Sequence, residues 1–444
     1  MTQSLNRSSR RRFLKTGVSA ALAPVIVPSS VLSSSRAEVP SERIAVGVIG
    51  LGSRGFNLID DLLRAKDAQI VAICDVDLLH YRDNPWGKGT AYGREAAQIK
   101  IEGHYQSPGG VSVESDFREV CSRDDLDAIV VATPDHWHAL VTLEALRNGK
   151  DVYCEKPLTH TFLEGQQVYR EVQKQKAVFQ TGSQQRSDKR FRRAVELVRN
   201  GRLGPINQIE VGLPAGYDHP MGAATATTPP HHLDYDFWCG PSPVLPYMRA
   251  RHHRWWRGHT AYGGGVLMDW IGHHNDIAHW ALDLDDSGPI RVEAVNWTYP
   301  ETEIYDTPSQ YEIQCEYSGG THSSISSQNQ LGTKFIGEDG WIFVNRQTLE
   351  ASDPSWCDEG FDSGPKKAYR SLNHMRNFLD CVRSREECIA PAETGHRSVT
   401  PGHLGYVSHR LGRALKWDPE AEKVIDDDAA NNLLHHQDYR EPWA

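Results

Sequence analysis

Three side chains, Lys156, Asp269 and His273, are of the types that proton transfer needs. Asp269 and His273 are four residues apart, so on a helix they share one face, where the carboxylate can orient the imidazole. Since the ordinary pKa of histidine is about 6.5, such a ring is mostly neutral at pH 7 and can accept a proton from a hydroxyl group. Lys156 could polarise the reacting oxygen or relay its proton. The same spacing also fits an exposed contact on a helix, so a catalytic role needs further support.

A glycine-rich turn near the start of the chain has the spacing of a phosphate-binding turn. The apolar, β-branched run 43–49 leads directly into this turn, and a helical pattern follows it. Gly50 permits the tight turn, Gly52 lets the backbone approach a pyrophosphate, and Gly55 lets the helix pack on the strand. The residues expected to hold a dinucleotide here are Gly50, Leu51, Gly52, Ser53, Arg54 and Gly55.

Asp75 indicates which dinucleotide is bound. It ends the next expected strand, 69–74, and lies twenty residues beyond Gly55, where an acid receives the ribose hydroxyls. Because the same carboxylate repels a 2′-phosphate, we expect NAD rather than NADP. Arg54 could serve a phosphate, which keeps NADP as the less favoured alternative.

The segment 214–261 is rich in proline, histidine and aromatic residues, with dense runs at 231–238 and 252–257. Histidine and aspartate are possible zinc ligands, but their spacing matches no established set, so we expect no metal. Aromatic rings that stack on sugars, beside polar groups that bond hydroxyls, favour a carbohydrate site instead. An aromatic loop packed against its own domain is the alternative. The residues expected to contact substrate are Arg186, Asp236, Trp256 and Tyr262.

Strands and helices alternate through the N-terminal half, which predicts a doubly wound parallel (Rossmann) sheet. Segment 77–110 is interpreted as an insertion on the ligand side, with a short helix near 94–101. The other elements expected here are strands 128–132 and 151–154 and helices 138–148 and 161–174.

From residue 206 the pattern changes to strands joined by glycine-containing turns, such as 318–320. It predicts a C-terminal α+β domain with a large, mostly antiparallel sheet. Helices are expected at 371–384 and 396–416, before an irregular tail at 426–444. The expected strands are 206–213, 290–297, 310–317, 321–328 and 334–337.

Composition excludes several classes of protein. The 444 residues carry 48 basic and 58 acidic side chains, a net charge of −10, which argues against a nucleic-acid partner. With 39% hydrophobic residues the chain is globular, and no apolar run reaches the roughly 20 residues that span a bilayer. The eight cysteines include no C-x-x-C pair, so neither a zinc ribbon nor a redox pair is indicated.

Residues 1–37 have the layout of an export signal. They contain six basic side chains and no acid, and a weakly apolar run covers 17–32. The run 9–15, Ser-Arg-Arg-Arg-Phe-Leu-Lys, resembles the twin-arginine export motif, so we expect a periplasmic or otherwise exported protein. A basic disordered arm is the alternative.

Three motifs in this order resemble the glucose-fructose oxidoreductase, inositol dehydrogenase and MocA family. They are Thr133-Pro134 with His138, then Glu155-Lys156-Pro157, then the run 263–273, Gly-Gly-Gly-Val-Leu-Met-Asp-Trp-Ile-Gly-His. The resemblance covers nearly the whole chain after residue 37.

The resemblance implies roles for the matching residues. It places Lys156 beside the nicotinamide and the substrate, with a Lys–Pro bond that is commonly cis, and puts Asp269 and His273 in the catalytic pocket. Thr133, Pro134, His138 and Glu155 are expected beside the cofactor. The division that follows is a signal at 1–37, an NAD-binding domain at 42–160, and a substrate-binding and oligomerisation domain at 161–444.

The resulting hypothesis is an NAD-dependent oxidoreductase that acts on a secondary hydroxyl of a sugar, glycoside or polyol, holds its cofactor tightly and forms homo-oligomers. One alternative rests on residues 236–241 and 280–284, which are similar to exported members related to NAD-dependent α-N-acetylgalactosaminidases. In those enzymes, transient oxidation leads to elimination of the aglycone. A non-catalytic sugar-binding protein is the alternative of another class.

Overall fold

The computed structural model describes residues 42–81 and 89–443. The expected export signal at 1–37 lies outside the described residues. Within them, no helix is both long and apolar enough to cross a membrane.

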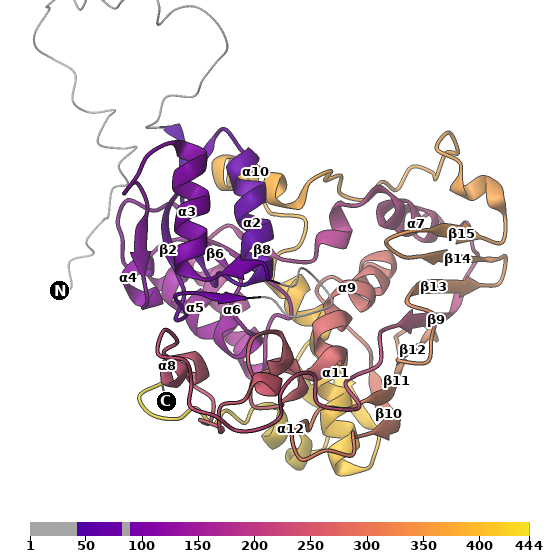
Figure 1. The fold of residues 1–444 in the computed structure, drawn as a ribbon. Coiled ribbons are helices and arrows are strands. Elements are labelled where there is room, and N and C mark those ends of the chain that lie inside the picture. Colours follow the sequence, from indigo (N-terminus) through magenta and orange to yellow (C-terminus); the bar gives the residue numbers. More distant parts are fainter. Residues whose placement is uncertain (1–41, 82–88, 444) are drawn as a thin grey trace, which may run out of the picture. The chain divides into compact units, whose positions relative to one another are not determined.

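The N-terminal half forms the expected parallel sheet, which has six strands (Figure 1). All five neighbouring pairs are parallel. In spatial order the strands are β5 (Ser112–Glu114), β2 (Ala68–Cys74), β1 (Ile44–Ile49), β6 (Ala128–Val131), β7 (Asp151–Cys154) and β8 (Phe179–Thr181).

Helices cover both faces of this sheet, because successive strand side chains point to opposite faces. Ala128 and Val130 of β6 join one buried cluster, and Ile129 and Val131 join the other. The first cluster includes side chains of α2 (Ser53–Arg64), α3 (Arg94–Tyr105) and α10 (His374–Ser384). The second includes side chains of α4 (Phe117–Cys121), α5 (Asp135–Arg147) and α6 (Phe162–Gln175).

The C-terminal half contains a nine-stranded sheet, seen edge-on at the right of Figure 1. It is mostly antiparallel, as expected, with one parallel pair between β9 and β12. In spatial order the strands are β15 (Leu349–Ala351), β14 (Trp341–Val344), β13 (Gly332–Gly337), β9 (Ile206–Gly212), β12 (His322–Ser326), β11 (Gln310–Glu316), β10 (Arg291–Thr298), β16 (Leu415–Asp418) and β17 (Lys423–Val424).

Three helices pack on one face of this sheet: α7 (Lys189–Arg199), α9 (Gly265–Leu282) and α11 (Ala392–Leu411). Helix α9 carries Asp269 and His273, and its apolar residues Leu267, Ile271 and Ile277 are fully buried in the core. The sheet therefore fixes the helix that presents the candidate catalytic side chains.

The long segment before α9 forms short helices with a small core of their own. These are α8 (Tyr235–Cys239), η4 (Arg249–Arg251) and η5 (His253–Gly258). Leu233, Tyr235, Trp238, Trp256 and Tyr262 belong to this core. Several aromatic residues of this segment therefore pack against one another, as the alternative interpretation of the segment expects.

Several expected boundaries are wrong for local physical reasons. Helix α11 ends at Leu411 because Gly412 adopts a left-handed conformation (φ 64°), and residues 415–418 form a strand instead. Helix α5 begins at Asp135, directly after Pro134, rather than at residue 138. The tail expected to be irregular contains α12 (Asp428–Leu434). The insertion adds a two-stranded sheet of β3 (His80–Tyr81) and β4 (Ala91–Tyr92).

Candidate functional site

The glycine turn and the candidate proton-transfer residues line one cavity of about 460 Å³. Gly50 and Gly52 lie between β1 and α2, Asp75 directly follows β2, and Lys156 follows β7 of the same parallel sheet. Asp269 and His273 come from α9. The two halves of the chain thus bring together residues that are more than 200 positions apart.

The three glycines of the turn have different surroundings. Gly50 has φ +93°, and a Cβ there would lie 2.5 Å from the Ala132 backbone. A Cβ on Gly55 would overlap the carbonyl oxygen of Gly50. A Cβ on Gly52 would meet no described protein atom within 4 Å, although Gly52 lines the cavity. Packing therefore accounts for Gly50 and Gly55, whereas Gly52 leaves space for a ligand.

This turn fits a dinucleotide phosphate. Gly52 is the N-cap of α2, and it provides no side-chain hydrogen bond to that end of the helix. The first backbone N–H groups of a helix, together with its dipole, favour an anion. Ser53 and Arg54 begin the helix and line the cavity, whereas Leu51 is fully buried behind the turn.

Asp75 links the turn to the end of β2. Its Oδ2 atom accepts a hydrogen bond from the backbone N–H of Leu51 at 2.6 Å, and its Oδ1 atom accepts one from Asp77 at 2.9 Å. Burial raises the pKa of the Asp75 carboxyl. Because each oxygen can accept a further hydrogen bond, the side chain can still receive the hydroxyls of a ribose.

Glu155 holds Arg54 at the rim of the cavity. Its Oε1 atom accepts hydrogen bonds from Arg54 Nε at 2.7 Å and from Gln184 Nε2 at 2.9 Å. Both Glu155 and Arg54 line the cavity. Glu155 is thus placed to orient Arg54 as well as to face a cofactor.

His138 connects two of the motifs that carry the resemblance. Its ring nitrogens lie 2.9 Å from the Pro157 carbonyl oxygen and 3.0 Å from that of Thr133. The Lys156–Pro157 bond is cis, as the resemblance implies. Thr133, Pro134 and His138 all line the cavity, but the ring of His138 is engaged with backbone and so positions its neighbours.

Lys156, Asp269 and Arg257 form a partly buried charged cluster. Lys156 Nζ donates to Asp269 Oδ1 at 2.7 Å and to the Asp269 carbonyl oxygen at 2.8 Å. Arg257 Nε lies 3.0 Å from the same Oδ1 atom. Although burial opposes ionisation, Arg257 and Lys156 hold the pKa of Asp269 well below its ordinary value. Asp269 is therefore ionised and fixes the ammonium group of Lys156.

The expected pairing of Asp269 with His273 does not form. The carboxylate is engaged by the two cations, and the Nδ1 atom of His273 is buried with no hydrogen-bond partner among the described residues. Burial lowers the pKa of His273 well below its ordinary value, and the charges of Lys156 and Arg346 add to this effect. The ring is thus neutral, as expected, but only weakly basic.

Asp135 lines the cavity although no sequence motif indicates a role for it. Its side chain is 2% exposed, and its Oδ2 atom has no hydrogen-bond partner in the described structure. Burial raises the pKa of Asp135 to about 7; the charge of Asp269 also raises it, whereas Arg257 opposes the shift. A carboxyl that titrates near neutral pH is well matched to proton transfer.

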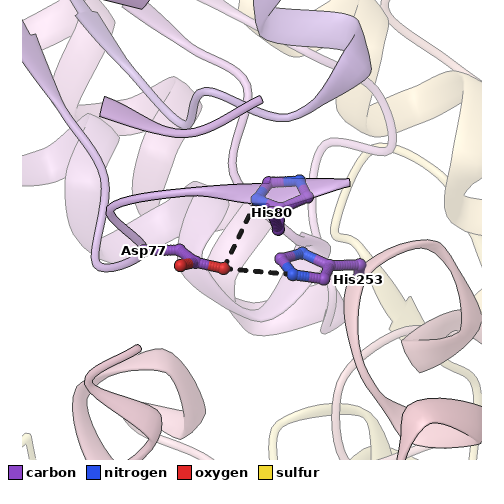
Figure 2. Close-up of side chains that lie close together, drawn as sticks. All are labelled: Asp77, His80 and His253. Carbon is purple, nitrogen blue, oxygen red and sulfur yellow. Dashed lines mark ion pairs between the residues drawn. The ribbon is translucent and has the colours of Figure 1, made fainter. Parts of the chain in front are cut away.

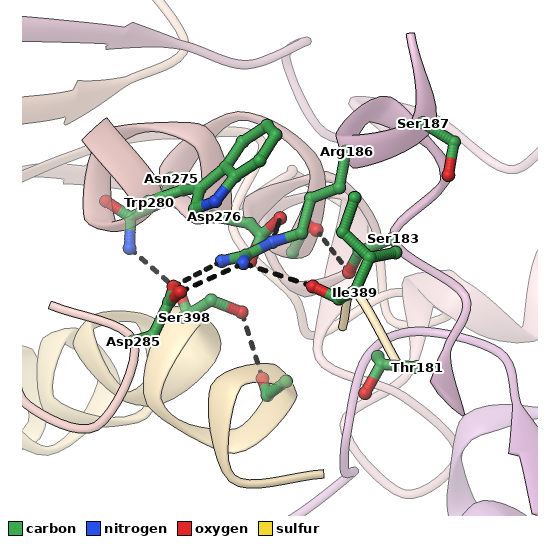
Figure 3. Close-up of polar contacts among 12 residues, drawn as sticks. Thr181, Ser183, Arg186, Ser187, Asn275, Asp276, Trp280, Asp285, Ile389 and Ser398 are labelled. Atoms are coloured by element: carbon green, nitrogen blue, oxygen red, sulfur yellow. Dashed lines mark hydrogen bonds and ion pairs between the residues drawn. The ribbon is translucent and has the colours of Figure 1, made fainter. Parts of the chain in front are cut away.

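Of the four residues expected to contact substrate, only Trp256 lines this cavity. Arg186 is instead buried in the core, where its guanidinium pairs with Asp276 at 2.8 Å and with Asp285 at 2.6 Å (Figure 3). Although burial disfavours its charge, these carboxylates raise the pKa of Arg186. Arg186 therefore has a structural role.

Tyr262 and Asp236 also lie outside the cavity lining. Tyr262 is fully buried, and its hydroxyl group donates to the Pro243 carbonyl oxygen at 2.9 Å. Asp236 is exposed in the first turn of α8 and pairs with Arg440 at 3.2 Å. Both residues stabilise the segment around α8 rather than the site.

Some site residues give little signal in the sequence. Arg257 lies within the aromatic run 252–257, where stacking on a sugar is the expected role, but its guanidinium covers the Trp256 ring at 4.2 Å and pairs with Asp269. Arg346 lines the cavity from the turn between β14 and β15, where an isolated arginine carries no recognisable pattern.

Comparison with known families gives matches over almost all described residues. Residues 44–183 match the family described as "Oxidoreductase family, NAD-binding Rossmann fold". Residues 188–444 match "Oxidoreductase family, C-terminal alpha/beta domain". Both descriptions belong to the family that the three motifs resemble.

The chain is also similar to individual proteins. It is 32% identical to an inositol 2-dehydrogenase of Rubrobacter xylanophilus over 68% of this chain and 72% of that protein. It is 35% identical to a glycosyl hydrolase family 109 protein of Saccharopolyspora erythraea, but only over 26% of this chain and 23% of that relative's length. The WlbA dehydrogenase of Bordetella pertussis, solved with NADH and UDP-GlcNAcA, has a similar fold, with a TM-score of 0.60, 20% identity, and coverage of 85% of this chain and 99% of that one.

Proposed function

Because the chain belongs to the Gfo/Idh/MocA oxidoreductase family, whose NAD-binding and C-terminal domains match it from residue 44 to residue 444, we propose that it oxidises a secondary hydroxyl group of a sugar, glycoside or polyol. A nicotinamide nucleotide bound at the glycine turn supplies the hydride acceptor. The observation that carries the proposal is the shared cavity, in which Lys156 lies with the phosphate-binding turn.

Lys156 acts on the substrate oxygen in this proposal. Asp269 accepts its hydrogen bonds through a side-chain and a backbone oxygen, which orients the ammonium group within the cavity. A positioned ammonium group hydrogen-bonds the hydroxyl that reacts and stabilises negative charge as it develops on the oxygen. Arg257 pairs with the same carboxylate oxygen and so helps to keep Asp269 in place.

The proton of the hydroxyl needs an acceptor, and two groups line the cavity with the required chemistry. The neutral ring of His273 has a free nitrogen, and Asp135 titrates near neutral pH. We propose that proton transfer involves Lys156 and His273 and that ionised Asp135 assists, since an acceptor is most effective when its pKa is near the working pH.

NAD and a carbohydrate substrate are the preferred ligands. Asp75 supports NAD, because a carboxylate that lines the cavity just after β2 repels a 2′-phosphate. The inositol dehydrogenase relative and the sugar-nucleotide complex of the structural neighbour support a polyhydroxylated substrate.

The test is a single-turnover experiment with purified protein. The chain is mixed with NAD and then with myo-inositol, free sugars or p-nitrophenyl glycosides, and NADH absorbance and keto products are measured. We expect one substrate class to reduce the nucleotide, and Lys156→Ala and His273→Ala to slow this step by roughly 10²–10⁴ with nucleotide affinity near that of the parent. Full reduction rates in Lys156→Ala would refute its assignment.

A second candidate function is NAD-dependent glycoside cleavage. It is favoured by the similarity to a glycosyl hydrolase family 109 protein, which is 35% identical to this chain over 116 residues. Release of p-nitrophenol with many turnovers and no net NADH would establish this function in place of dehydrogenation. Tight binding of a sugar without either product would indicate the non-catalytic alternative.

We further propose that the protein is exported with its nucleotide already bound and forms homo-oligomers. Since a nucleotide supplied only once must be recycled in place, dialysis of purified protein should leave most of it bound. Size-exclusion chromatography with light scattering measures the oligomer. A nucleotide lost within hours of dialysis, or a strictly monomeric mass, would contradict the corresponding statement.

A further inference from the structure

Asp77, His80 and His253 bring three metal-ligating side chains together at the edge of the cavity (Figure 2). Asp77 and His80 lie in the segment that follows β2, and His253 begins η5. Asp77 is 1% exposed, and the two histidines are mostly buried and line the cavity. The residues come from both halves of the chain, so their spacing in the sequence gives no ligand pattern.

The distances among the three ligand atoms fit one bound ion. Asp77 Oδ2 lies 3.3 Å from His80 Nδ1 and 3.1 Å from His253 Nε2. All three atoms lie within 4.8 Å of one another. In a tetrahedral zinc site, with bonds of about 2.0 Å, neighbouring ligand atoms are about 3.3 Å apart.

These atoms are close without the geometry of hydrogen bonds. Asp77 Oδ2 and His80 Nδ1 are buried and have no hydrogen-bond partner among the described residues. In an ordinary Asp–His network, the N–H group points at the carboxylate oxygen. A cation bound between Asp77 Oδ2 and His80 Nδ1 would give both of these buried atoms a partner.

The other oxygen of Asp77 is held in place by further contacts. Asp77 Oδ1 lies 2.8 Å from His232 Nδ1 and accepts a hydrogen bond from the Leu79 backbone N–H at 3.3 Å. Hydrogen bonds of this kind to a ligating carboxylate orient it toward a metal. His80 and His253 also stack on each other, with ring centroids 3.6 Å apart.

We propose that Asp77, His80 and His253 bind a divalent transition-metal ion, with zinc the best match to two imidazoles and one carboxylate. Three protein ligands leave one coordination position for water or a bound ligand. This proposal replaces the expectation, based on spacing, that the chain binds no metal. The ion would connect the segment after β2 to η5. It would therefore hold η5 beside the cavity.

Metal content tests the proposal independently of the reaction. The full-length protein is purified, loaded with Zn²⁺, desalted and analysed by inductively coupled plasma mass spectrometry. We expect about one zinc ion per chain in the parent and less than about a tenth of that in Asp77→Asn and His253→Gln, because a site with only two protein ligands should not retain the ion through desalting. Circular dichroism establishes that each variant is folded.

Two matched variants and one spectroscopic measurement make the test decisive. His231→Gln changes an exposed neighbour and should keep its zinc. His232→Gln removes the contact to Asp77 Oδ1 without removing a proposed ligand and should bind zinc roughly 10- to 100-fold more weakly. If Asp77→Asn fails to fold, Co²⁺ added to the metal-stripped parent should still give the visible absorption of a tetrahedral site. A parent that retains neither Zn²⁺ nor Co²⁺, or folded ligand variants that keep parental metal content, would overturn the proposal.

Discussion

Replacing Gly52 with alanine should separate ligand binding from folding. Gly52 has extended backbone angles, φ −78° and ψ −171°, which alanine adopts without strain. The added Cβ would meet no described protein atom within 4 Å, yet it would enter the cavity. The new methyl group therefore occupies only the space that we assign to the pyrophosphate.

The magnitudes follow from these surroundings. Because Gly52 caps α2 without a side-chain hydrogen bond, its loss should change the free energy of unfolding by less than about 1 kcal/mol. A methyl group that displaces a phosphate costs at least one charge-assisted hydrogen bond, about 1.5–3 kcal/mol. Nucleotide affinity should therefore fall roughly 10- to 150-fold.

Gly50→Ala is the matched control. The positive φ of Gly50 costs alanine about 1–2 kcal/mol. Overlap of the new Cβ with the Ala132 backbone should add about 1–3 kcal/mol. Urea unfolding followed by circular dichroism, and NADH fluorescence titration, measure the two quantities for both variants. Parental NADH affinity in Gly52→Ala, or equal destabilisation of the two variants, would refute the assignment of this turn.

Four further predictions concern individual residues. Lys156→Ala should lower turnover by roughly 10²–10⁴ while the fluorescence titration shows parental NADH affinity, and equal losses in both would place Lys156 in binding alone. Since burial raises the pKa of Asp135 to about 7, its carboxyl group is protonated below that pH and ionised above it. The single-turnover rate should therefore rise through pH 7, and Asp135→Asn should flatten this rise. An unchanged pH profile in Asp135→Asn would exclude Asp135 from proton transfer. Asp75→Ala should weaken NAD binding and improve NADP binding in parallel titrations, whereas equal NAD and NADP affinities in the parent would contradict the proposed selectivity. Joint replacement of Arg10 and Arg11 by lysine should leave uncleaved precursor in the cytoplasm on immunoblots of cell fractions, and undiminished export would contradict a twin-arginine signal.

The sequence is most informative where local rules determine the structure. The run 43–49, the glycine turn and Asp75 belong to one strand–turn–helix–strand unit, so periodicity and glycine spacing predict their contacts. The parallel sheet follows from the alternation of strands with helices, and the antiparallel sheet follows from successive strands joined by glycine-containing turns. Gly412 shows the limit of periodicity, because one left-handed residue ends α11 and lets residues 415–418 form a strand.

Contacts between distant segments are harder to predict. The spacing of Asp269 and His273 allows them to make contact on one helix face. It cannot show that the Asp269 carboxylate instead pairs with the positive charges of Lys156 and Arg257. The guanidinium group of Arg186 has the chemistry to bind a substrate, yet it pairs with Asp276 and Asp285 in the core. The Asp77 cluster has no sequence signature because its ligands come from segments more than 170 residues apart.

The most direct test of the central claim is the redox state of the nucleotide after the protein meets its substrate. Purified protein is loaded with NAD, desalted, incubated anaerobically with myo-inositol and the sugar panel, and then denatured so that the released nucleotide can be identified and quantified. We expect about one nucleotide per chain, released as NAD without substrate and in part as NADH with an accepted sugar or polyol, while Lys156→Ala releases only NAD. A chain that retains no nucleotide, or a Lys156→Ala variant that reduces NAD as fast as the parent, would contradict the central claim.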